Sequence, residues 1–372
     1  MNTTETAAEI YIGVMSGTSL DGVDAVLCEI DASGKPRFLG RQHTPFCPKL
    51  RQDILALNSP GHNEIHMAAV VANELADLYA DTINHLLDRT KTSSVNVRAV
   101  GVHGQTIRHQ PDQGYTIQIN APARLAEQVR IDVVADFRSR DIAAGGQGAP
   151  LVPAFHAAVF SGDSTRVVLN LGGIANVTVL QPDAGVIGFD TGPANMLMDA
   201  WCEKHTGRTF DEDGAWGAGG RASDQLLQTL IASQPWFDLP APKSTGRDMF
   251  NMGWLESVLG QTDLALSAQD VQATLQHLTA STVLDALQRT GLQDVDLFVC
   301  GGGARNKAVI KALLDRGARS VQTTEDLGIP AEDVEAIAFA WLAWAFINRK
   351  PANLPSVTGA SGPRVLGALW PA

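Results

Sequence analysis

The stretch 166–195, which reads RVVLNLGGIANVTVLQPDAGVIGFDTGPAN, constrains the fold of this chain more than any other part of the sequence. Its first apolar run is typical of a strand buried on both faces, and the run stops at Gly172 and Gly173. A second β-rich run follows at 176–180, so the pattern predicts a hairpin whose turn carries no bulky side chain. A phosphate can approach the backbone N–H groups of such a turn closely. A third strand then carries Asp190, and a carboxylate fixed there is a candidate general base.

The same plan occurs a second time near the N-terminus. Residues 11–15 form an apolar run, 16–22 form a polar glycine turn, and 23–30 form a second apolar run. Glycine turns mostly only reverse the chain, and an Asp beside Gly is usually a turn former. The second copy favours a functional interpretation, because it indicates two similar halves that face each other across a cleft.

The N-terminal turn is rich in groups that bind phosphate. The hydroxyls of Ser16, Thr18 and Ser19 add donors to the backbone amides, and Asp21 and Asp24 are available to hold a metal ion or its waters. Taken alone, however, this turn could be an ordinary hairpin loop.

A third glycine turn follows a strand expected at 295–300. Gly301, Gly302 and Gly303 precede a helix expected to start at Asn306. A helix N-terminus beside a turn without side chains accepts the phosphate, ribose or base of a nucleotide. The sequence here matches neither the GxGxxG fingerprint nor a Walker A loop.

Length and composition limit the remaining options. A chain of 372 residues is too long for one typical core, so two domains are expected. The formal net charge of -12 and the lack of long Lys/Arg runs argue against a nucleic-acid surface. The N-terminus does not resemble a signal peptide, and no apolar run is long enough for a membrane span. Four cysteines without CxxC spacing fit a reducing cytoplasm better than a zinc site or a disulfide framework.

Several polar residues lie where a cleft is expected. His103 stands at the end of a predicted strand beside a glycine, although a hydrogen-bonded structural His is an equally good interpretation. Arg138 and Arg140 form a basic cluster before the glycine-rich segment 145–150, which could line a pocket or act as a hinge between the halves.

Three other charged residues are more ambiguous. Lys243 and Arg247, in a polar loop, could meet an anionic group, but on spacing alone they are better explained as surface charges. Glu335 lies in the first turn of a predicted helix, where acids usually serve the helix dipole.

Three glycine turns after strands, in two similar halves, resemble the actin, sugar kinase and Hsp70 superfamily, whose halves close over ATP. Within it the chain closely resembles the anhydro-N-acetylmuramic acid kinase family, over nearly its whole length and in family order. The segments that carry this resemblance are GVMSGTSLDGVD from Gly13, GVHGQT from Gly101, DFRSRDIAAGGQGAPLVP from Asp136, LNLGGIANVT from Leu169, GFDTGPANMLMD from Gly188, PKSTGRD from Pro242, CGGGARN from Cys300 and EAIAFAWLA from Glu335. Two departures are mild: Ala194 stands where Gly is frequent, and Asp248 where Glu is usual.

The resemblance implies an α/β fold with two similar ribonuclease H-like (actin-like ATPase) domains and a cleft between them. We expect residues 1–137 to form the first domain and 138–372 the second, with the last residues able to pack back on the first. The resemblance also implies ATP and Mg²⁺ as cofactors, a small-molecule sugar substrate, a cytoplasmic location and a homodimer. The apolar helix with Trp341, Trp344 and Phe346 could supply the dimer interface, and core packing explains these residues equally well.

The family implies a reaction in which 1,6-anhydro-N-acetylmuramic acid, ATP and water give N-acetylmuramic acid 6-phosphate and ADP, in peptidoglycan recycling. Asp190 matches the catalytic aspartate of the family, and Glu335 matches an acid associated with the sugar site. We also assign His103, Arg138 and Gly192 to the sugar side, and Asp21 to the metal. The residues expected to bind ATP are Gly17, Thr18, Ser19, Leu20, Asp21, Gly22, Val23 and Asp24 in the phosphate loop, and Gly172, Gly173, Gly301, Gly302, Gly303 and Asn306 in the other two turns.

Two rival functions remain at this point. An ordinary hydroxyl kinase would use Asp190 to deprotonate a sugar hydroxyl, and would need no water. An ATP-switched binding module, like the chaperone or actin branches, would normally need a peptide-binding domain or a filament surface, and no long extra segment supplies either.

Overall fold

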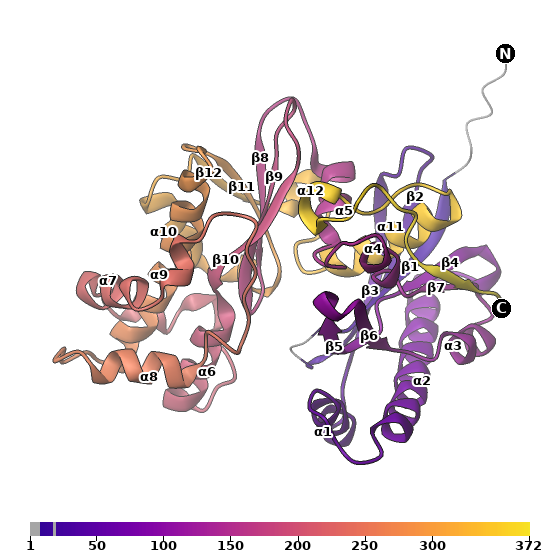
Figure 1. Ribbon diagram of the computed structural model, residues 1–372, viewed down its shortest axis with the longest axis horizontal. Helices are drawn as coiled ribbons and strands as arrows, with labels where there is room; N and C mark the ends of the chain where they lie inside the picture. Colours follow the sequence, from indigo (N-terminus) through magenta and orange to yellow (C-terminus); the bar gives the residue numbers. More distant parts are fainter. Residues whose placement is uncertain (1–7, 18–19) are drawn as a thin grey trace. The chain divides into compact units, whose positions relative to one another are not determined.

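The computed structural model of the protein describes residues 8–17 and 20–372 (Figure 1). The chain forms two compact units: unit 1 holds the chain up to Val159 together with Asp333–Ala372, and unit 2 holds Phe160–Glu332. This division differs from the expected boundary between 137 and 138. The physical reason is that the last part of the chain packs on the sheet of unit 1, through helix α11 (Val334–Ile347) and strand β13 (Ala368–Trp370).

Unit 1 is built on a mixed six-stranded sheet with the order β13-β7-β4-β1-β2-β3. β1, β2 and β3 form an antiparallel meander, whereas β4 lies parallel to β1 on its other side and β7 lies parallel to β4. β13 pairs antiparallel with β7, so the end of the chain lies on the sheet of this unit. The remaining strands are β1 Glu9–Met15, β2 Gly22–Ile30, β3 Pro36–Pro45, β4 Val97–Val102 and β7 Val133–Ala135, and a separate hairpin consists of β5 Gln105–Gln110 and β6 Tyr115–Ile119.

Unit 2 repeats this plan in a five-stranded sheet with the order β10-β9-β8-β11-β12. β8, β9 and β10 form an antiparallel meander, and β11 and β12 continue in parallel beyond β8. Both units therefore contain the strand order 3-2-1-4-5 with the same directions, which is the order of ribonuclease H-like domains. The prediction of an α/β protein with two similar halves is confirmed. The strands are β8 Arg166–Leu171, β9 Ile174–Leu180, β10 Ile187–Pro193, β11 Asp296–Cys300 and β12 Ser320–Thr323.

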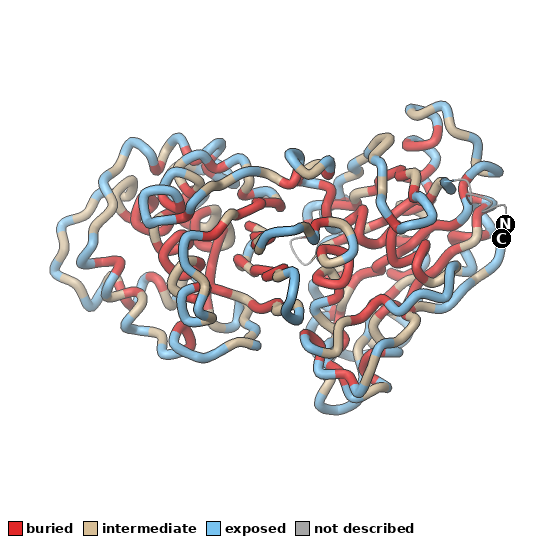
Figure 2. The backbone as a smooth tube through the Cα atoms, turned by 90° about the horizontal axis from the view of Figure 1, so that it is seen from above, coloured by how far each residue is buried: buried red, intermediate tan, exposed pale blue. Residues whose placement is uncertain are grey.

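Helices complete both units. The apolar spacing of 63–88 predicts a long helix, and a second long helix is expected at 268–289; these correspond to α2 and α9. None of the helices among the described residues combines the length and the apolar character needed to cross a membrane. In Figure 2 the buried residues run through the interior of each unit, and the exposed residues lie mainly along its outside. Unit 1 has α1 Pro48–Leu57, α2 Glu64–Thr90, α3 Pro122–Val129, α4 Ser139–Ala143, α5 Val152–Phe160, α11 and α12 Pro355–Thr358; unit 2 has α6 Asn195–Thr206, α7 Asp224–Ala232, α8 Met252–Gly260, α9 Ala268–Arg289 and α10 Lys307–Asp315.

The sheet of unit 1 lies between two helices because its strands alternate their faces. Ile12 and Val14 of β1 belong to the core cluster that contains residues of α2, and the intervening Gly13 faces α11. A Cβ atom on Gly13 would lie 1.9 Å from the Ala336 carbonyl oxygen, and one on Gly101 of β4 would lie 2.0 Å from the Phe339 carbonyl oxygen. The glycines therefore let α11 approach the sheet closely.

The packing of α11 on the sheet of unit 1 also buries the tryptophans of this helix. Trp341 and Trp344 are 5% and 6% exposed within unit 1. Core packing thus explains both tryptophans, whereas Phe346 on the same helix is only half-buried. A dimer interface on α11 remains a prediction, and the two tryptophans would contribute little to it.

Candidate active site

Strand β1 leads into the predicted phosphate loop at the carboxyl end of the strand. Ser16 is buried, and its hydroxyl donates to the Gly104 carbonyl (3.1 Å) and accepts from the Tyr79 hydroxyl (2.8 Å). The Leu20 amide donates to the Gly17 carbonyl at 3.3 Å. These bonds fix both ends of the loop. Thr18 and Ser19, which we expected to bind ATP, lie outside the described residues.

The rest of this loop divides into core residues and accessible acids. Leu20 and Val23 are buried in the core of unit 1, so only their backbone atoms could contact a nucleotide. Gly22 packs against β3, because a Cβ atom there would lie 2.4 Å from the Thr44 carbonyl oxygen. We predicted that residues 17–24 bind ATP. At Leu20, Gly22 and Val23 this prediction can hold only for backbone groups.

Asp21 and Asp24 are the acids that could hold a metal ion in unit 1. Asp21 Oδ1 accepts from the Gly22 amide at 2.9 Å, and Asp24 Oδ1 lies 2.9 Å from His43 Nδ1. No cluster of three or more metal-ligating side chains occurs among the residues that the structure describes. Mg²⁺ usually binds one or two carboxylates together with phosphate oxygens and water. Asp21 and Asp24 therefore fit an ion that arrives with a nucleotide.

His103 and Arg138, predicted separately from the sequence, are in direct contact. Arg138 Nη2 lies 2.9 Å from His103 Nε2, and His103 Nδ1 lies 3.3 Å from the Ser16 carbonyl oxygen. Since a carbonyl and a guanidinium face the two ring nitrogens, His103 carries its proton on Nδ1 and accepts at Nε2. Burial, assisted by the charge of Arg138, lowers the pKa of His103 to about 3, so the ring stays neutral. His103 thus connects Arg138 to the start of the phosphate loop.

Glu335 belongs to the same group of residues. Its pKa is raised by desolvation and by the charges of Asp24 and Asp21, while Arg138 acts in the opposite direction. The side chain is nevertheless accessible to solvent, and no described residue donates a hydrogen bond to its carboxylate. Glu335 is therefore more than a helix-dipole acid, because it lies in the electrostatic field of the phosphate loop and Arg138. Arg140, the other basic residue of this segment, is exposed.

In unit 2, Asp190 lies on β10 beside an irregularity in the pairing with β9. The register shifts between Asp190 and Gly192, as in a β-bulge. Asp190 Oδ2 accepts from the Ser244 hydroxyl (3.0 Å) and from the Thr245 amide (2.9 Å). Burial raises the pKa of Asp190, whereas these two donors lower it. No described residue donates to Oδ1, which leaves that oxygen available to a substrate.

The loop that holds Asp190 is anchored by an aromatic cluster. The Lys243 ammonium donates to the Trp236 and Phe237 carbonyls (3.2 and 2.8 Å) and lies 4.2 Å from the centroid of the Trp236 ring. The Trp236 indole donates to the Ser244 carbonyl at 3.1 Å. Burial, together with the charge of Arg289, lowers the pKa of Lys243 to about 8. Lys243 is thus engaged in holding the loop, and not in binding an anion as one interpretation of the sequence suggested.

The two glycine turns of unit 2 lie close together. A Cβ atom on Gly303 would lie 2.6 Å from Leu171 Cβ, immediately before the turn of Gly172 and Gly173. Gly301 has a φ of 81°, and a Cβ atom there would lie 2.4 Å from Asn170 Oδ1. The second of these turns therefore requires glycine at 301 and 303, and both turns leave backbone surface free of side chains.

Two of the predicted ligands in unit 2 are occupied by internal contacts. Asn306 caps α10, because its Oδ1 accepts from the Ala308 and Val309 amides. Gly192 is enclosed, since a Cβ atom there would lie 2.9 Å from the Phe237 ring and 3.0 Å from the Thr282 hydroxyl. The prediction that Gly192 and Asn306 bind a ligand stays a prediction, and at Gly192 it concerns backbone groups.

The structure thus forms two groups of predicted residues, one in each unit. The phosphate-loop residues, His103, Arg138 and Glu335 lie together in unit 1, and Asp190 and the glycine turns belong to unit 2. The sequence analysis missed Ser244 and Thr245, although they stand beside the charged residues that it singled out. Hydroxyl residues in a polar loop carry no periodic signal, so only the fold shows that they face Asp190.

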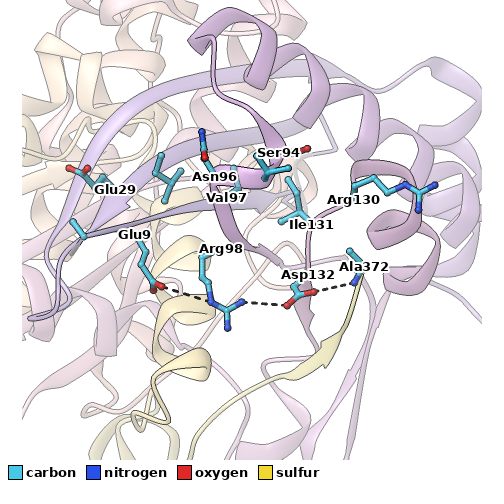
Figure 3. Close-up of a pocket in the computed structure, with 13 residues that line it drawn as sticks. Glu9, Glu29, Ser94, Asn96, Val97, Arg98, Arg130, Ile131, Asp132 and Ala372 are labelled. Carbon is cyan, nitrogen blue, oxygen red and sulfur yellow. Dashed lines mark hydrogen bonds and ion pairs between the residues drawn. The ribbon is translucent and has the colours of Figure 1, made fainter. Parts of the chain in front are cut away.

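A different hollow, of about 540 Å³, occurs elsewhere in unit 1 (Figure 3). It is lined by the starts of β1 and β4, and Arg98 lies there between Glu9 (3.9 Å) and Asp132 (3.4 Å). The predicted phosphate loop follows the other end of β1. This hollow contains none of the predicted site residues and is not part of the candidate active site.

A ribonuclease H-like sheet that occurs in both units, with a glycine-containing turn between its first two strands each time, places this protein in the ribonuclease H-like class of α/β proteins. The sequence model described as "Anhydro-N-acetylmuramic acid kinase" matches residues 9–372. The chain belongs to the anhydro-N-acetylmuramic acid kinase family.

Relatives with more than half of their residues identical agree with this assignment. A protein named anhydro-N-acetylmuramic acid kinase from Bordetella avium is 57% identical, over 100% of this chain and 99% of that protein. One of the same name from Chromobacterium violaceum is 51% identical, over 98% of this chain and 99% of the other. Among solved structures, the chain is similar to component A of (R)-2-hydroxyglutaryl-CoA dehydratase from Acidaminococcus fermentans, with a TM-score of 0.48 and 13% identity over 90% of this chain and 96% of that one.

Proposed function

We propose that this protein is an ATP-dependent kinase that opens the 1,6-anhydro ring of 1,6-anhydro-N-acetylmuramic acid with water and phosphorylates O6. The products are N-acetylmuramic acid 6-phosphate and ADP, and the pathway is peptidoglycan recycling. The observation that carries the proposal is the geometry of Asp190, whose Oδ2 is held by Ser244 and Thr245 while no described residue donates to Oδ1.

In the proposed reaction Oδ1 of Asp190 takes a proton from a water molecule as the water oxygen attacks the anomeric carbon. The bond between the anomeric carbon and O6 breaks, and O6 attacks the γ-phosphorus of ATP in line, so that ADP leaves. The two events belong together because an O6 alkoxide is a poor leaving group unless its charge passes to another acceptor. Burial raises the pKa of Asp190 and strengthens it as a base, while its two donors keep it ionised.

Backbone amides of the three glycine turns would bind the phosphates and the nucleoside, since these turns carry no obstructing side chains. Mg²⁺, bound near Asp21 or Asp24, would neutralise charge on the phosphate oxygens. Arg138 and Glu335 would contact the sugar, and neutral His103 would hold Arg138 in place. These assignments use only contacts within each unit.

An ordinary hydroxyl kinase is the main rival. The test is ADP release by the purified protein with Mg²⁺-ATP and 1,6-anhydro-N-acetylmuramic acid in ¹⁸O-water, with mass analysis of the sugar. We expect a 6-phosphorylated product that carries the label at its anomeric oxygen. A phosphorylated product that keeps the anhydro ring would support the ordinary hydroxyl kinase. ATP binding without sugar-dependent turnover would support the ATP-switched binding module.

Replacing the proposed base tests the mechanism directly. Asp190→Asn keeps the shape of the side chain but cannot accept the proton, so we expect kcat to fall by about 10²- to 10⁴-fold. Asp183→Asn removes an exposed acid from the preceding loop and serves as the matched control. Activity of Asp190→Asn within a few-fold of the parent would show that another group is the base.

We also propose a cytoplasmic location and a homodimer. Cys28 and Cys202 are buried thiols, which fits a reducing compartment. A dimer would have to use a surface other than the tryptophans of α11, because these are buried. Size-exclusion chromatography with light scattering tests the dimer.

A further inference from the structure

Asp141, on α4, is a charged residue that the proposed mechanism does not use. Its side chain is 0% exposed, and a buried carboxylate is costly unless donors surround it. Three donors do so: the Gly148 amide lies 2.8 Å from Oδ2, and Asn353 Nδ2 (2.6 Å) and the Thr358 hydroxyl (2.8 Å) contact Oδ1. Asp141 therefore joins the glycine-rich segment 145–150 to the C-terminal part of the chain.

Further hydrogen bonds connect the glycine-rich segment to the C-terminal part of the chain. The Gln147 amide donates to the Thr358 carbonyl (2.7 Å), and the Ser361 amide donates to the Ala144 carbonyl (2.8 Å). A Cβ atom on Gly146 would lie only 2.2 Å from Asp141 Oδ2, so the backbone passes directly against the carboxylate. The segment that the sequence suggested as a pocket lining or a hinge is thus fixed to unit 1 on both sides.

The fixed segment in turn holds Arg138. Arg138 Nη1 donates to the Gly148 carbonyl at 2.9 Å, from the same residue whose amide binds Asp141. Arg138 Nη2 donates to His103, and His103 Nδ1 donates to the Ser16 carbonyl. A continuous chain of hydrogen bonds therefore runs from Asp141 through Gly148, Arg138 and His103 to the residue before the phosphate loop.

We infer that Asp141 is a positioning residue, which acts through Gly148 to aim the Arg138 guanidinium at the sugar and to hold His103 against the phosphate loop. This inference rests on the proposed function, because it assumes that Arg138 contacts the sugar. The C-terminal residues Asn353 and Thr358 are then part of the frame of the active site. Arg138 has two of its five N–H donors committed to Gly148 and His103, which fixes the plane of the guanidinium.

The test compares steady-state kinetics of Asp141→Asn and Thr358→Val with the parent. Asp141→Asn places an amide where three donors converge, and Thr358→Val removes one donor while keeping the shape. Because small displacements of a positioning group cost about 10²-fold at most, we expect the KM for the sugar to rise about tenfold, with a smaller change in the KM for ATP. Thr358→Ser restores the hydroxyl and should restore the KM. Asp136→Asn, at an exposed acid on the same segment, is the matched control.

Melting temperature, measured on each variant, separates positioning from folding. If Asp141→Asn does not fold, the comparison of Thr358→Val with Thr358→Ser still tests the inference. Variants that melt earlier but keep the parental KM for the sugar per folded molecule would overturn the inference and leave Asp141 a purely structural residue.

A readout without turnover keeps the inference distinct from the proposed function. ¹⁵N chemical shifts of the imidazole of His103 report its tautomer, which the structure fixes as protonated on Nδ1. We expect Thr358→Val to disturb this signal and Thr358→Ser to retain it. An inactive parent protein would defeat the proposed function, and with it the sugar contact of Arg138, but would leave the link from Asp141 to His103 standing if the signal responds. An unaltered His103 signal in Thr358→Val would defeat the inference and leave the proposed function untouched.

Discussion

Removing the hydroxyl of Ser244 tests whether the hydrogen bonds to Asp190 set its strength as a base. Ser244 donates to Oδ2 at 3.0 Å, and the Thr245 amide donates to the same oxygen at 2.9 Å. Ser244→Ala deletes the first donor and leaves the second in place. The ionised carboxylate then loses stabilisation relative to the protonated acid, so the pKa of Asp190 rises further.

The magnitude follows from the exposure of Ser244. A hydrogen bond to a charged group contributes about 1.5–3 kcal/mol in general, and solvent at this exposed hydroxyl reduces the contribution to about 1 kcal/mol. A change of about 1 kcal/mol is about fivefold in an equilibrium constant. We therefore expect kcat/KM for the sugar to be about fivefold lower on the acidic limb of the pH profile. At higher pH, where the carboxylate is ionised in both proteins, the values should agree.

The assay is kcat/KM from sugar-dependent ADP release, measured from about pH 5 to about pH 8.5. Ser257→Ala, which removes a hydroxyl from the exposed side of α8, is the control and should reproduce the parental profile. An acidic limb at the parental position, or an equal loss of activity at every pH, would refute the argument that Ser244 tunes Asp190.

Two further predictions concern stability. Gly101→Ala should lower the melting temperature of unit 1 strongly or prevent folding, because the new methyl group would meet the Phe339 carbonyl oxygen at 2.0 Å, whereas Gly185→Ala has open space and should melt like the parent. Burial lowers the pKa of His103 and His156 to about 3, so the unfolded state binds more protons below the ordinary value of 6.5. The free energy of unfolding should then decrease as the pH is lowered from about 6.5 to about 3, by at most about 1.4 kcal/mol per pH unit for each histidine. Urea titrations should show a shallower fall for His156→Gln, and equal slopes would contradict the assignment.

The hairpins and long helices were predictable because their signals are local. Alternation of apolar residues and glycine at the turns indicated β1 with β2 and β8 with β9, and helical spacing indicated α2 and α9. Asp190 was singled out for a different reason: an Asp beside Gly is usually a turn former, and the repeat of the glycine hairpin in the chain favoured a functional interpretation. Its role as a base remains a prediction. No local signal predicts the domain boundary, because β13 and α11 belong to unit 1 through pairing and packing with strands far away in the sequence.

The contacts of the predicted site residues could not be predicted from the sequence either. Nothing in the spacing of His103 and Arg138 shows that they touch, or that Asp141 holds Gly148 with help from Thr358, 217 residues later in the chain. Hydroxyl and amide donors become specific only when the fold places them against a buried acceptor.

The α/β class, the two similar halves, the glycine turns and the family were predictable, because each depends on short patterns or on their order along the chain. The tertiary structure alone decided which donors hold Asp190, why His103 stays neutral, and which distant segments frame Arg138. The reason is physical: the pKa and the orientation of a side chain depend on burial and on partners within a few ångströms, and those partners are brought together only by folding.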